Sequence, residues 1–335
     1  LANLIKRDSD GFNRWEASQT LALQVLDDAI KAYGAGQLDA FSVDPILLDS
    51  YQNLLDTPPE DKAMLALMLT LPSESYIAEQ YSEVNVEAIH FARKRLAADI
   101  AQSLSVPFMA IVTAYDGQRA YSPDADQVAA RALKNTALSY CMIAPDHSLL
   151  SLCERAFNEA NNMTDQMAAL SMLVNCEQAE AEPVAAAALE RFYQQWQDEA
   201  LVVNQWFALQ ARSAKAGALA RVEALLRHPA YDGNNPNKIR SLISSFAAAN
   251  PIGFHSGNPG DTSAGYRFLA DHIIALNQKN PQIAAGLLRP LVQWRRYPPA
   301  RGEAMRNQLT RISTTEGLSA DVFEVVSKAL AKPAV

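Results

Sequence analysis

The sequence predicts an all-α protein, an irregular α-solenoid or superhelix in which antiparallel helix pairs are stacked. Three observations support this fold class. Glycine is scarce, at 13 of 335 residues, and 49% of the residues are apolar against 20% charged, a globular composition that favours helices. Apolar residues recur at helical spacing in many short stretches, and proline or asparagine marks the brief turns between them. No repeat of fixed period is found, so a regular tetratricopeptide or ankyrin array is not expected.

The first third of the chain contains four clear helical stretches. Gly11–Tyr33 is the first long one, and the glycines that follow it suit a helix end. A shorter helix is bracketed by Pro45 and the pair Pro58-Pro59. Ala63–Leu71 is apolar on every side, which predicts a deeply buried helix that turns back at the next proline. Val86–Leu104 is strongly periodic, and its polar side carries one histidine and three basic residues.

The stretch Val106–Tyr115 is ambiguous, because its composition also suits a buried strand. Its neighbours in the sequence are all helical, and a single strand would have no partner for its backbone hydrogen bonds. We therefore predict a helix. Ser122-Pro123 is expected to start the next helix, and Asn162 with Asp165 has the spacing of a helix cap. Further helices are predicted over Pro183–Trp196, Ala200–Ala211 and Ala214–Arg227.

The last hundred residues contain a helix–loop–helix unit marked by the pairs Asn235-Pro236, Asn250-Pro251 and Asn280-Pro281. Asparagine is a good N-cap and proline suits the first helical position, so each pair predicts a helix start. Between the first two pairs, four apolar residues from Ile239 to Phe246 fall on one helical stripe. The chain is then expected to end with helices around Ile283–Trp294, Ala300–Ile312 and Asp321–Leu330.

Length, charge and cysteine content restrict the classes of protein. A chain of 335 residues exceeds one compact core, which favours either two domains or an elongated repeat architecture. A net charge of −8 argues against a nucleic-acid interface. Three cysteines without metal-ligand spacing indicate buried thiols in a reducing compartment. No transmembrane stretch or secretory signal is recognised, and the start without Met suggests a piece of a longer polypeptide.

Several blocks of the sequence resemble one known family, the bacterial aminopeptidase N family of zinc-dependent alanyl aminopeptidases. They match its C-terminal region in the same order: GFNRWEASQTL, FNEANNMTDQMAALS, NQWFALQA, NPNKIRSLISSFAAANPIGFH and PLVQWRRY. The resemblance covers nearly all 335 residues. It implies that residues 1–335 form a single elongated C-terminal α-helical domain, an armadillo- or HEAT-like superhelix. Such a domain curves over a catalytic domain and closes the chamber above its zinc ion.

The chemistry of such an enzyme is not expected on this chain. A zinc aminopeptidase of this kind needs H-E-x-x-H on a helix, and none of the five histidines is followed by Glu. The G-x-M-E-N segment that holds the substrate's free amine in the family is also missing. We therefore expect no catalytic residue and no metal ligand here, with zinc bound only in the full-length enzyme, and we expect the chain alone to be inactive.

Other candidate sites have ordinary structural explanations. The stretch 257–260 is rich in glycine, but no strand precedes it and no lysine follows, so it is not a phosphate loop. Glu159 and Asp165 are one carboxylate pair, but a helix cap explains Asp165. A contact between His255 and Asp261 is expected to stabilise the loop between them. The expected core tryptophans are Trp196, Trp206 and Trp294, and Arg295-Arg296 suit a helix C-terminus.

Arg240 is the main candidate site residue. It is predicted to lie in the first turn of its helix, where the helix dipole disfavours a cation by up to ~1 kcal/mol. A solvated surface arginine explains the position by itself. The resemblance implies a different role, because an arginine of the family that faces the substrate chamber is matched by Arg240. A second arginine of close relatives is replaced by Gly286, and Arg289, one turn further on, is a candidate substitute.

Two functional hypotheses follow. In the first, the chain is the non-catalytic C-terminal domain of a cytoplasmic bacterial metallo-aminopeptidase that removes N-terminal residues from peptides. Its partners would be the catalytic domain of the same polypeptide and peptide substrates, with no nucleic acid or membrane. In the second, it is a free-standing α-solenoid that binds a protein partner. A reading frame that continues upstream into H-E-x-x-H would decide for the first.

Overall fold

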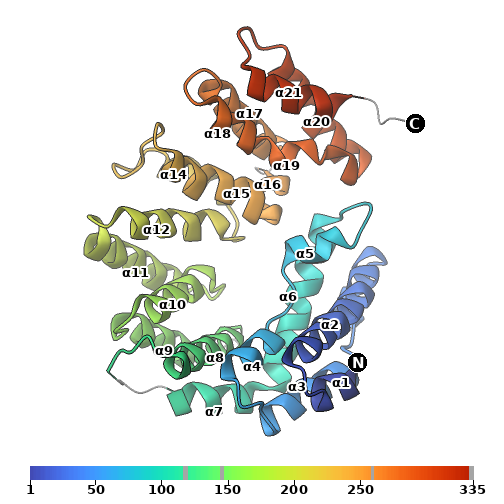
Figure 1. Ribbon diagram of the computed structural model, residues 1–335, viewed down its shortest axis with the longest axis vertical. Helices are drawn as coiled ribbons and strands as arrows, with labels where there is room; N and C mark the ends of the chain where they lie inside the picture. Colours follow the sequence, from blue (N-terminus) through green and yellow to red (C-terminus); the bar gives the residue numbers. More distant parts are fainter. Residues whose placement is uncertain (116–119, 144–146, 258–259, 332–335) are drawn as a thin grey trace. The chain divides into compact units, whose positions relative to one another are not determined.

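The computed structural model describes residues 1–115, 120–143, 147–257 and 260–331. Within these ranges the regular elements are helices, and none is a β-strand (Figure 1). The predicted all-α class is therefore confirmed. By their internal contacts the residues divide into two compact units. Unit 1 comprises Leu1–Ile77 and Glu87–Leu189, and unit 2 comprises Ala78–Val86 and Glu190–Val335.

Several helices that follow one another in unit 1 pack side by side, as expected for stacked helix pairs. Its helices are α1 (Ala2–Arg7), α2 (Gly11–Gly34), α3 (Pro45–Asp56), α4 (Lys62–Leu69), α5 (Glu74–Glu79), α6 (Val86–Ser103), α7 (Ser105–Tyr115), α8 (Ala125–Cys141), α9 (His147–Asn158) and α10 (Met163–Asn175). The divisions between the units fall within α5, after the first residue of α6 and within α11 (Ala181–Trp196).

The core of unit 1 is anchored where α4, α7 and α8 meet. The buried ring of Phe108 on α7 stacks on Tyr140 of α8, with ring centroids 4.7 Å apart. The Tyr140 hydroxyl donates to the carbonyl of Leu69 at the end of α4, at 2.7 Å. Burial raises the pKa of Tyr140 well above its usual value, so the phenol stays a neutral donor. One aromatic residue thus ties three helices together.

Unit 2 continues the same construction with shorter helices. These are α12 (Ala200–Arg212), α13 (Ala218–Leu225), α14 (Pro236–Ile239), α15 (Ser245–Ala249), α16 (Pro251–Ser256), α17 (Ala264–Leu276), α18 (Pro281–Leu287), α19 (Arg289–Val292), α20 (Pro299–Ser313) and α21 (Ala320–Leu330). A π-helical segment, Arg240–Ser244, joins α14 to α15, and a 3-10 turn, Trp294–Arg296, follows α19.

The core of unit 2 contains side-chain hydrogen bonds that are fully buried. Asn250 is 1% exposed and caps α16 by accepting from the backbone N–H of Gly253 at 3.0 Å. Its side-chain N–H group donates to the carbonyls of Ala211 and Ser213, at 3.0 and 2.8 Å. The α16 N-terminus is thereby fastened to the end of α12. Where α16 meets α17, a Cβ atom on Gly265 would lie 2.3 Å from a backbone oxygen, so only glycine fits.

The segment Ala78–Val86 is held in unit 2 by one arginine. The guanidinium of Arg296 donates to the carbonyls of Ala78 and Tyr81, at 2.7 and 3.0 Å, and its own carbonyl accepts from the Val84 N–H at 2.7 Å. The neighbouring Arg295 donates to Ala329 and Ala331 at the end of α21. The structural interpretation of this arginine pair is therefore confirmed, through contacts with distant carbonyls.

Most predicted helices are present, and the three Asn-Pro helix starts are confirmed: Asn235, Asn250 and Asn280 each accept backbone N–H groups, with proline at the first helical position. The helix predicted over the ambiguous stretch is confirmed as α7. The capping pair Asn162 and Asp165 is also confirmed, since the Asp165 N–H donates to the Asn162 side chain at 2.9 Å.

Some details of the prediction are wrong. The apolar helix predicted over Ala63–Leu71 starts at Lys62 and is not buried on every side, because Leu67 is 53% exposed. The cap of α8 is Asp124 and not Ser122-Pro123. Here a carboxylate two residues later accepts from the Gln127 N–H at 2.9 Å, which suits a helix dipole better than a hydroxyl.

Two helices in unit 2 are shorter than predicted. The helix expected over Ala214–Arg227 is only α13, because Gly217 adopts a left-handed conformation immediately before it. The helix expected over Ile283–Trp294 is broken into α18 and α19. The break precedes Pro290, whose ring disfavours a continuous helix through the residues before it.

No single helix in the described part of the chain is long and apolar enough to cross a membrane. Only α6 and α7 taken together pass that test, and they are bent by 76° relative to each other.

Candidate functional site

Arg240 opens the π-helical segment between α14 and α15. Asn235 accepts the N–H groups of Asn237 and Lys238, and Pro236 occupies the first helical position. Arg240 is therefore the fifth helical residue, so the prediction that it lies in the first turn is wrong and the dipole penalty there does not apply. Its side chain is exposed and makes no hydrogen bond or ion pair with any residue that the structure describes.

The π-helical turn changes the backbone at this arginine. The Arg240 carbonyl accepts both the N–H of Ser245, five residues on, and the Ser245 hydroxyl, the latter at 3.3 Å. A π-turn inserts one residue into an α-helix and is frequent at functional sites. The apolar stripe from Ile239 to Phe246 is compatible with either helix type, so the sequence carries no signal for this feature.

The two cations of this stretch differ in environment. Lys238 is only 8% exposed, and its ammonium lies over the ring of Phe207 at 5.3 Å from the centroid. Burial lowers the pKa of Lys238. Its neighbour His228 packs edge-on against Tyr193 at 4.6 Å, and burial also lowers the pKa of that histidine. Lys238 thus belongs to the packing of unit 2, whereas Arg240 is available to a ligand.

Arg289 and Gly286 lie on α19 and α18. The Arg289 side chain is exposed, and within the described ranges it has no hydrogen-bond or ion-pair partner. Gly286 is also exposed, and a Cβ atom added to it would meet nothing within 4 Å. A large side chain would therefore fit there, and its absence is not imposed by packing. Within unit 2, α19, which begins at Arg289, packs against α15, the helix that follows the π-helical segment of Arg240. Their roles in a substrate chamber stay a prediction.

The contact expected between His255 and Asp261 is not formed. His255 is 4% exposed, and its Nδ1 atom shares a hydrogen bond with the Tyr266 hydroxyl at 2.8 Å. Burial, assisted by the nearby Arg301, lowers the pKa of His255 to about 3. Asp261 instead pairs with Arg267, whose hydrogen bond is the main reason that the pKa of that carboxyl is depressed. Both groups stabilise the α16–α17 connection.

Other candidates are also placed by the structure. Asp165 accepts from Lys134 at 2.7 Å and Asn135 at 2.9 Å, so it is a structural carboxylate rather than half of a catalytic pair. The predicted buried thiols, Cys141, Cys153 and Cys176, are confirmed. Trp206 is buried, but Trp196 and Trp294 are only half-buried, so the prediction of three core tryptophans is wrong for two of them. No group of three or more His, Cys, Asp or Glu side chains with metal-binding geometry occurs among the described residues.

Large apolar side chains are exposed mainly in unit 1. Of the thirteen that are exposed in the described ranges, eleven lie there: Leu1, Leu4, Phe12, Ile46, Leu67, Tyr76, Phe91, Val106, Tyr121, Val128 and Ile143. The other two are Leu201 and Phe323 in unit 2. Exposed apolar side chains that form a contiguous patch mark contact sites for another protein surface, whereas single ones are ordinary. We call these eleven residues the unit 1 apolar set.

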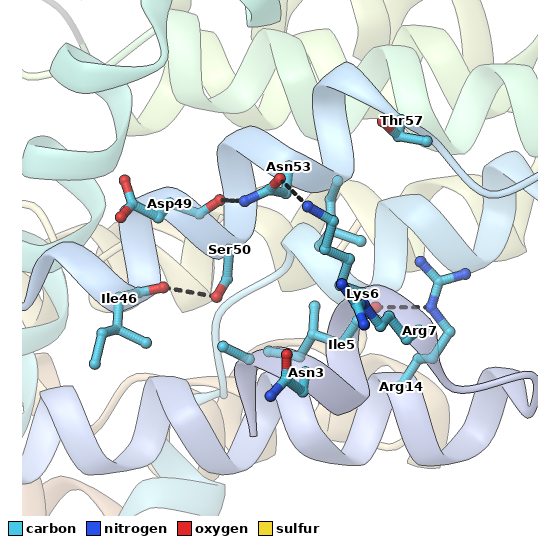
Figure 2. Close-up of a pocket in the computed structure, with 12 residues that line it drawn as sticks. Asn3, Ile5, Lys6, Arg7, Arg14, Ile46, Asp49, Ser50, Asn53 and Thr57 are labelled. Atoms are coloured by element: carbon cyan, nitrogen blue, oxygen red, sulfur yellow. Dashed lines mark hydrogen bonds between the residues drawn. The ribbon is translucent and has the colours of Figure 1, made fainter.

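One member of this set, Ile46, lines a pocket between α1 and α3, shown in Figure 2. The pocket has a volume of about 400 Å³. Its lining includes apolar side chains from both helices and three basic side chains, Lys6, Arg7 and Arg14. The sequence does not predict this pocket, because Lys6, Arg7 and Arg14 follow no recognisable motif. They line one pocket only because α1 packs against α2 and α3.

The comparisons with known proteins agree with one another. A family model described as a domain of unknown function (DUF3458_C) with ARM repeats matches residues 1–331. The aminopeptidase N of Haemophilus influenzae is 36% identical over 330 residues, which are 98% of this chain and 36% of that protein. The aminopeptidase N of Escherichia coli is 35% identical over 331 residues, 99% of this chain and 37% of that protein. That of Caulobacter vibrioides is 38% identical over 327 residues, 98% of this chain and 36% of that protein.

A crystal structure of Legionella pneumophila aminopeptidase A in complex with aspartic acid has the same fold, with a TM-score of 0.85 and 29% sequence identity. The match covers 98% of this chain and 38% of that one. The chain therefore spans little more than a third of the length of the relatives it matches. These findings confirm the family resemblance seen in the sequence, and the ARM-repeat description confirms the predicted α-solenoid.

Proposed function

This chain belongs to the DUF3458_C family of ARM-repeat domains, and we propose that it is the non-catalytic C-terminal domain of a zinc-dependent aminopeptidase, a cytoplasmic bacterial enzyme. In this proposal residues 1–335 act as one elongated domain that closes the substrate chamber over the active site. The complete enzyme removes N-terminal residues from peptides.

The observation that carries the proposal is the extent of the match. Nearly the whole chain aligns with aminopeptidases, but with only 36% to 37% of the length of those from Haemophilus influenzae and Escherichia coli. The sequence contains no H-E-x-x-H, and its described side chains do not form a set of ligands that fits a zinc ion. We therefore assign no zinc chemistry to this chain, and place the zinc and the general base on the remaining polypeptide.

The unit 1 apolar set supports the same proposal. A solenoid that stands alone is expected to expose apolar residues singly, since each exposed patch favours association. Here most exposed apolar side chains lie on one of the two units. A large catalytic domain packed on unit 1 would remove them from water, at roughly 25 cal/mol for each Å² of apolar surface buried.

In the proposed enzyme Arg240 and Arg289 line the chamber. A peptide held by its free amine near the zinc presents its carboxylate at the other end. The planar guanidinium group can hold a carboxylate through two parallel hydrogen bonds, which lysine and glutamine cannot reproduce. Arg240 suits this role because its guanidinium is exposed and has no partner among the described residues.

The gene provides the first test. The proposal expects the reading frame to continue upstream of residue 1 into a segment with H-E-x-x-H and a further glutamate ligand. A stop codon and start site at the beginning of this chain would instead favour the alternative, a free-standing α-solenoid that binds a protein partner. In that case the unit 1 apolar set would be the surface for the partner.

A further inference from the structure

The pocket between α1 and α3, which we call the α1–α3 groove, differs from the rest of the surface in its charge. Its volume is about 400 Å³, and it is bordered by Lys6, Arg7 and Arg14, with Asp49 as the acidic residue of its lining (Figure 2). The whole chain carries a net charge of −8. A group of three basic side chains against one acidic one is therefore a local reversal of the overall charge.

Among the described residues, these three basic side chains have no carboxylate partner. Lys6 donates to the amide oxygen of Asn53 at 2.9 Å, and Arg14 uses its Nε atom to donate to the Ile5 carbonyl at 2.8 Å (Figure 2). Arg7 has no hydrogen bond or ion pair within the described ranges. Elsewhere in unit 1, five cations each pair with an aspartate or glutamate, namely Lys31, Lys62, Lys94, Arg95 and Lys134. Arg93 and Arg131 instead donate to carbonyl and amide oxygens. The remaining hydrogen-bond donors of these three side chains therefore have no partner among the described residues at the groove.

The helices that carry these basic side chains and line the groove, α1, α2 and α3, also bear exposed apolar side chains. Phe12 at the start of α2 is 61% exposed, and Ile46, which lines the groove, is 51% exposed. Leu1, next to the lining residue Ala2, and Leu4, between the lining residues Asn3 and Ile5, are also exposed. A small free anion would satisfy the cations without covering these residues. An acidic side chain on an apolar protein segment would do both.

We propose that the α1–α3 groove is the docking site for an acidic side chain carried on an apolar segment of the catalytic part of the same polypeptide. This inference rests on the proposed function. In that arrangement the catalytic part joins the chain at Leu1, whose next two residues line the groove. The relatives hold nearly two thirds of their length outside the matched region, and the proposal has part of that polypeptide pack on this chain.

Hydrogen exchange in the full-length polypeptide and in the isolated chain tests the docking. α3 is the reporter, because it lies inside the chain in both proteins, whereas the exchange of α1 changes with any extension at Leu1. We expect the amides of α3 to exchange at least about tenfold more slowly in the full-length polypeptide. Equal exchange of α3 in the two proteins would overturn the docking site.

Charge reversal tests the acidic partner. Arg7→Glu removes a cation that supports nothing else in the described structure, and Lys279→Glu is its control, exposed and unpartnered in unit 2. In the full-length polypeptide, Arg7→Glu should reduce the extra protection of α3 about fivefold or more, and Lys279→Glu should leave it unchanged. Protection that survives Arg7→Glu, or that Lys279→Glu reduces equally, would contradict an acidic partner.

The outcomes separate this inference from the proposed function. If the full-length polypeptide hydrolyses alanyl substrates while α3 gains no protection, the aminopeptidase proposal stands and the groove is not the docking site. If no catalytic segment is encoded upstream, the proposed function and this inference both fail. The isolated Arg7→Glu chain should unfold at the same denaturant concentration as the parent, which shows that the variant itself folds.

Discussion

The helices of unit 1 and unit 2 begin in different ways. Four helices of unit 1 are capped by a carboxylate, from Asp10, Asp44, Asp61 or Asp124. Three helices of unit 2 are capped by a neutral amide that precedes proline, from Asn235, Asn250 or Asn280. A charged cap must stay near water, whereas an amide can be buried and still donate hydrogen bonds of its own.

The difference extends to the surfaces of the two units. Unit 2 buries Asn250 and His255 as hydrogen-bonded polar groups, and it exposes Arg240 and Arg289, whose side chains have no partner among the described residues. Unit 1 keeps its polar caps in water and exposes most of the large apolar side chains. The buried hydrogen bonds and exposed arginines of unit 2 suit a surface that holds a charged ligand. The exposed apolar side chains of unit 1 suit a surface that another domain covers. The experiments below are ordered by the size of the effect that we expect.

The largest effect is expected from the buried cap of unit 2. Asn250→Ala removes the cap of α16 and leaves the buried carbonyls of Ala211 and Ser213 without their donor. We expect a loss of about 3–5 kcal/mol in the free energy of unfolding. Asn235→Ala, at an exposed cap with the same Asn-Pro sequence, should cost only about 1 kcal/mol. Urea unfolding followed by circular dichroism measures both, and equal losses would show that burial does not distinguish the two caps.

A second effect concerns acid stability. The pKa of His255 is about 3 in the folded chain, below its ordinary value of 6.5, so folding favours the neutral imidazole. The unfolded chain binds the proton below pH 6.5, and stability is therefore lost as pH falls from there toward 3. For this histidine alone the loss is about 2–3 kcal/mol between pH 7.5 and pH 4.5.

His255→Asn tests this assignment, because asparagine cannot take up the proton. We expect the variant to be less stable than the parent at pH 7.5, with a smaller further loss on acidification. Urea midpoints measured at both pH values provide the comparison. An unchanged pH dependence would place the acid-sensitive group elsewhere in the chain.

The third effect concerns the ligand. In the full-length enzyme, Arg240→Ala should raise KM for short free-acid peptides about tenfold, equivalent to roughly 1.4 kcal/mol, with kcat less affected. Anilide substrates lack the carboxylate and should respond little. Arg227→Ala is the control, since Arg227 is also exposed in unit 2 and its side chain makes no hydrogen bond or ion pair in the described structure. Equal losses on both substrate types would mean that Arg240 supports the fold.

The smallest effect for each residue is expected at the unit 1 apolar set. Val106→Ser and Phe12→Ser should change the unfolding free energy of the isolated chain by no more than about 0.5 kcal/mol, because both side chains are largely in water. In the full-length polypeptide each should destabilise by about 1 kcal/mol, from lost apolar burial. Leu201→Ser in unit 2 should be neutral in both proteins. Neutral effects of all three would remove the contrast between the units.

The sequence predicted features that depend on nearest neighbours. The Asn-Pro helix starts, the cap at Asn162 and the helix over the ambiguous stretch follow from local chemistry. The π-helical turn at Arg240 could not be predicted, because its apolar stripe suits an α-helix equally well. The partner of His255 is a tyrosine eleven residues away, chosen by how α16 packs on α17. The helix type at Arg240 and the partner of His255 are determined by tertiary packing, which local sequence does not encode.

The exposure of the unit 1 apolar set shows the same limit. Leu67 belongs to the stretch that is apolar on every side, and Val106 begins the stretch whose composition also suits a buried strand, so burial is expected for both. In this chain Val106 is 79% exposed. The arginines were identified by family resemblance, and the structure adds only that they are exposed and free to bind.

The most direct test of the proposed function compares the isolated chain with the full-length polypeptide in three measurements. Circular dichroism, zinc analysis and an alanyl-anilide assay are applied to both. We expect the isolated chain to be folded and helical, to bind no stoichiometric zinc and to hydrolyse no substrate, while the full-length polypeptide does both. Stoichiometric zinc together with robust hydrolysis by the isolated chain would contradict the proposal that this domain is non-catalytic.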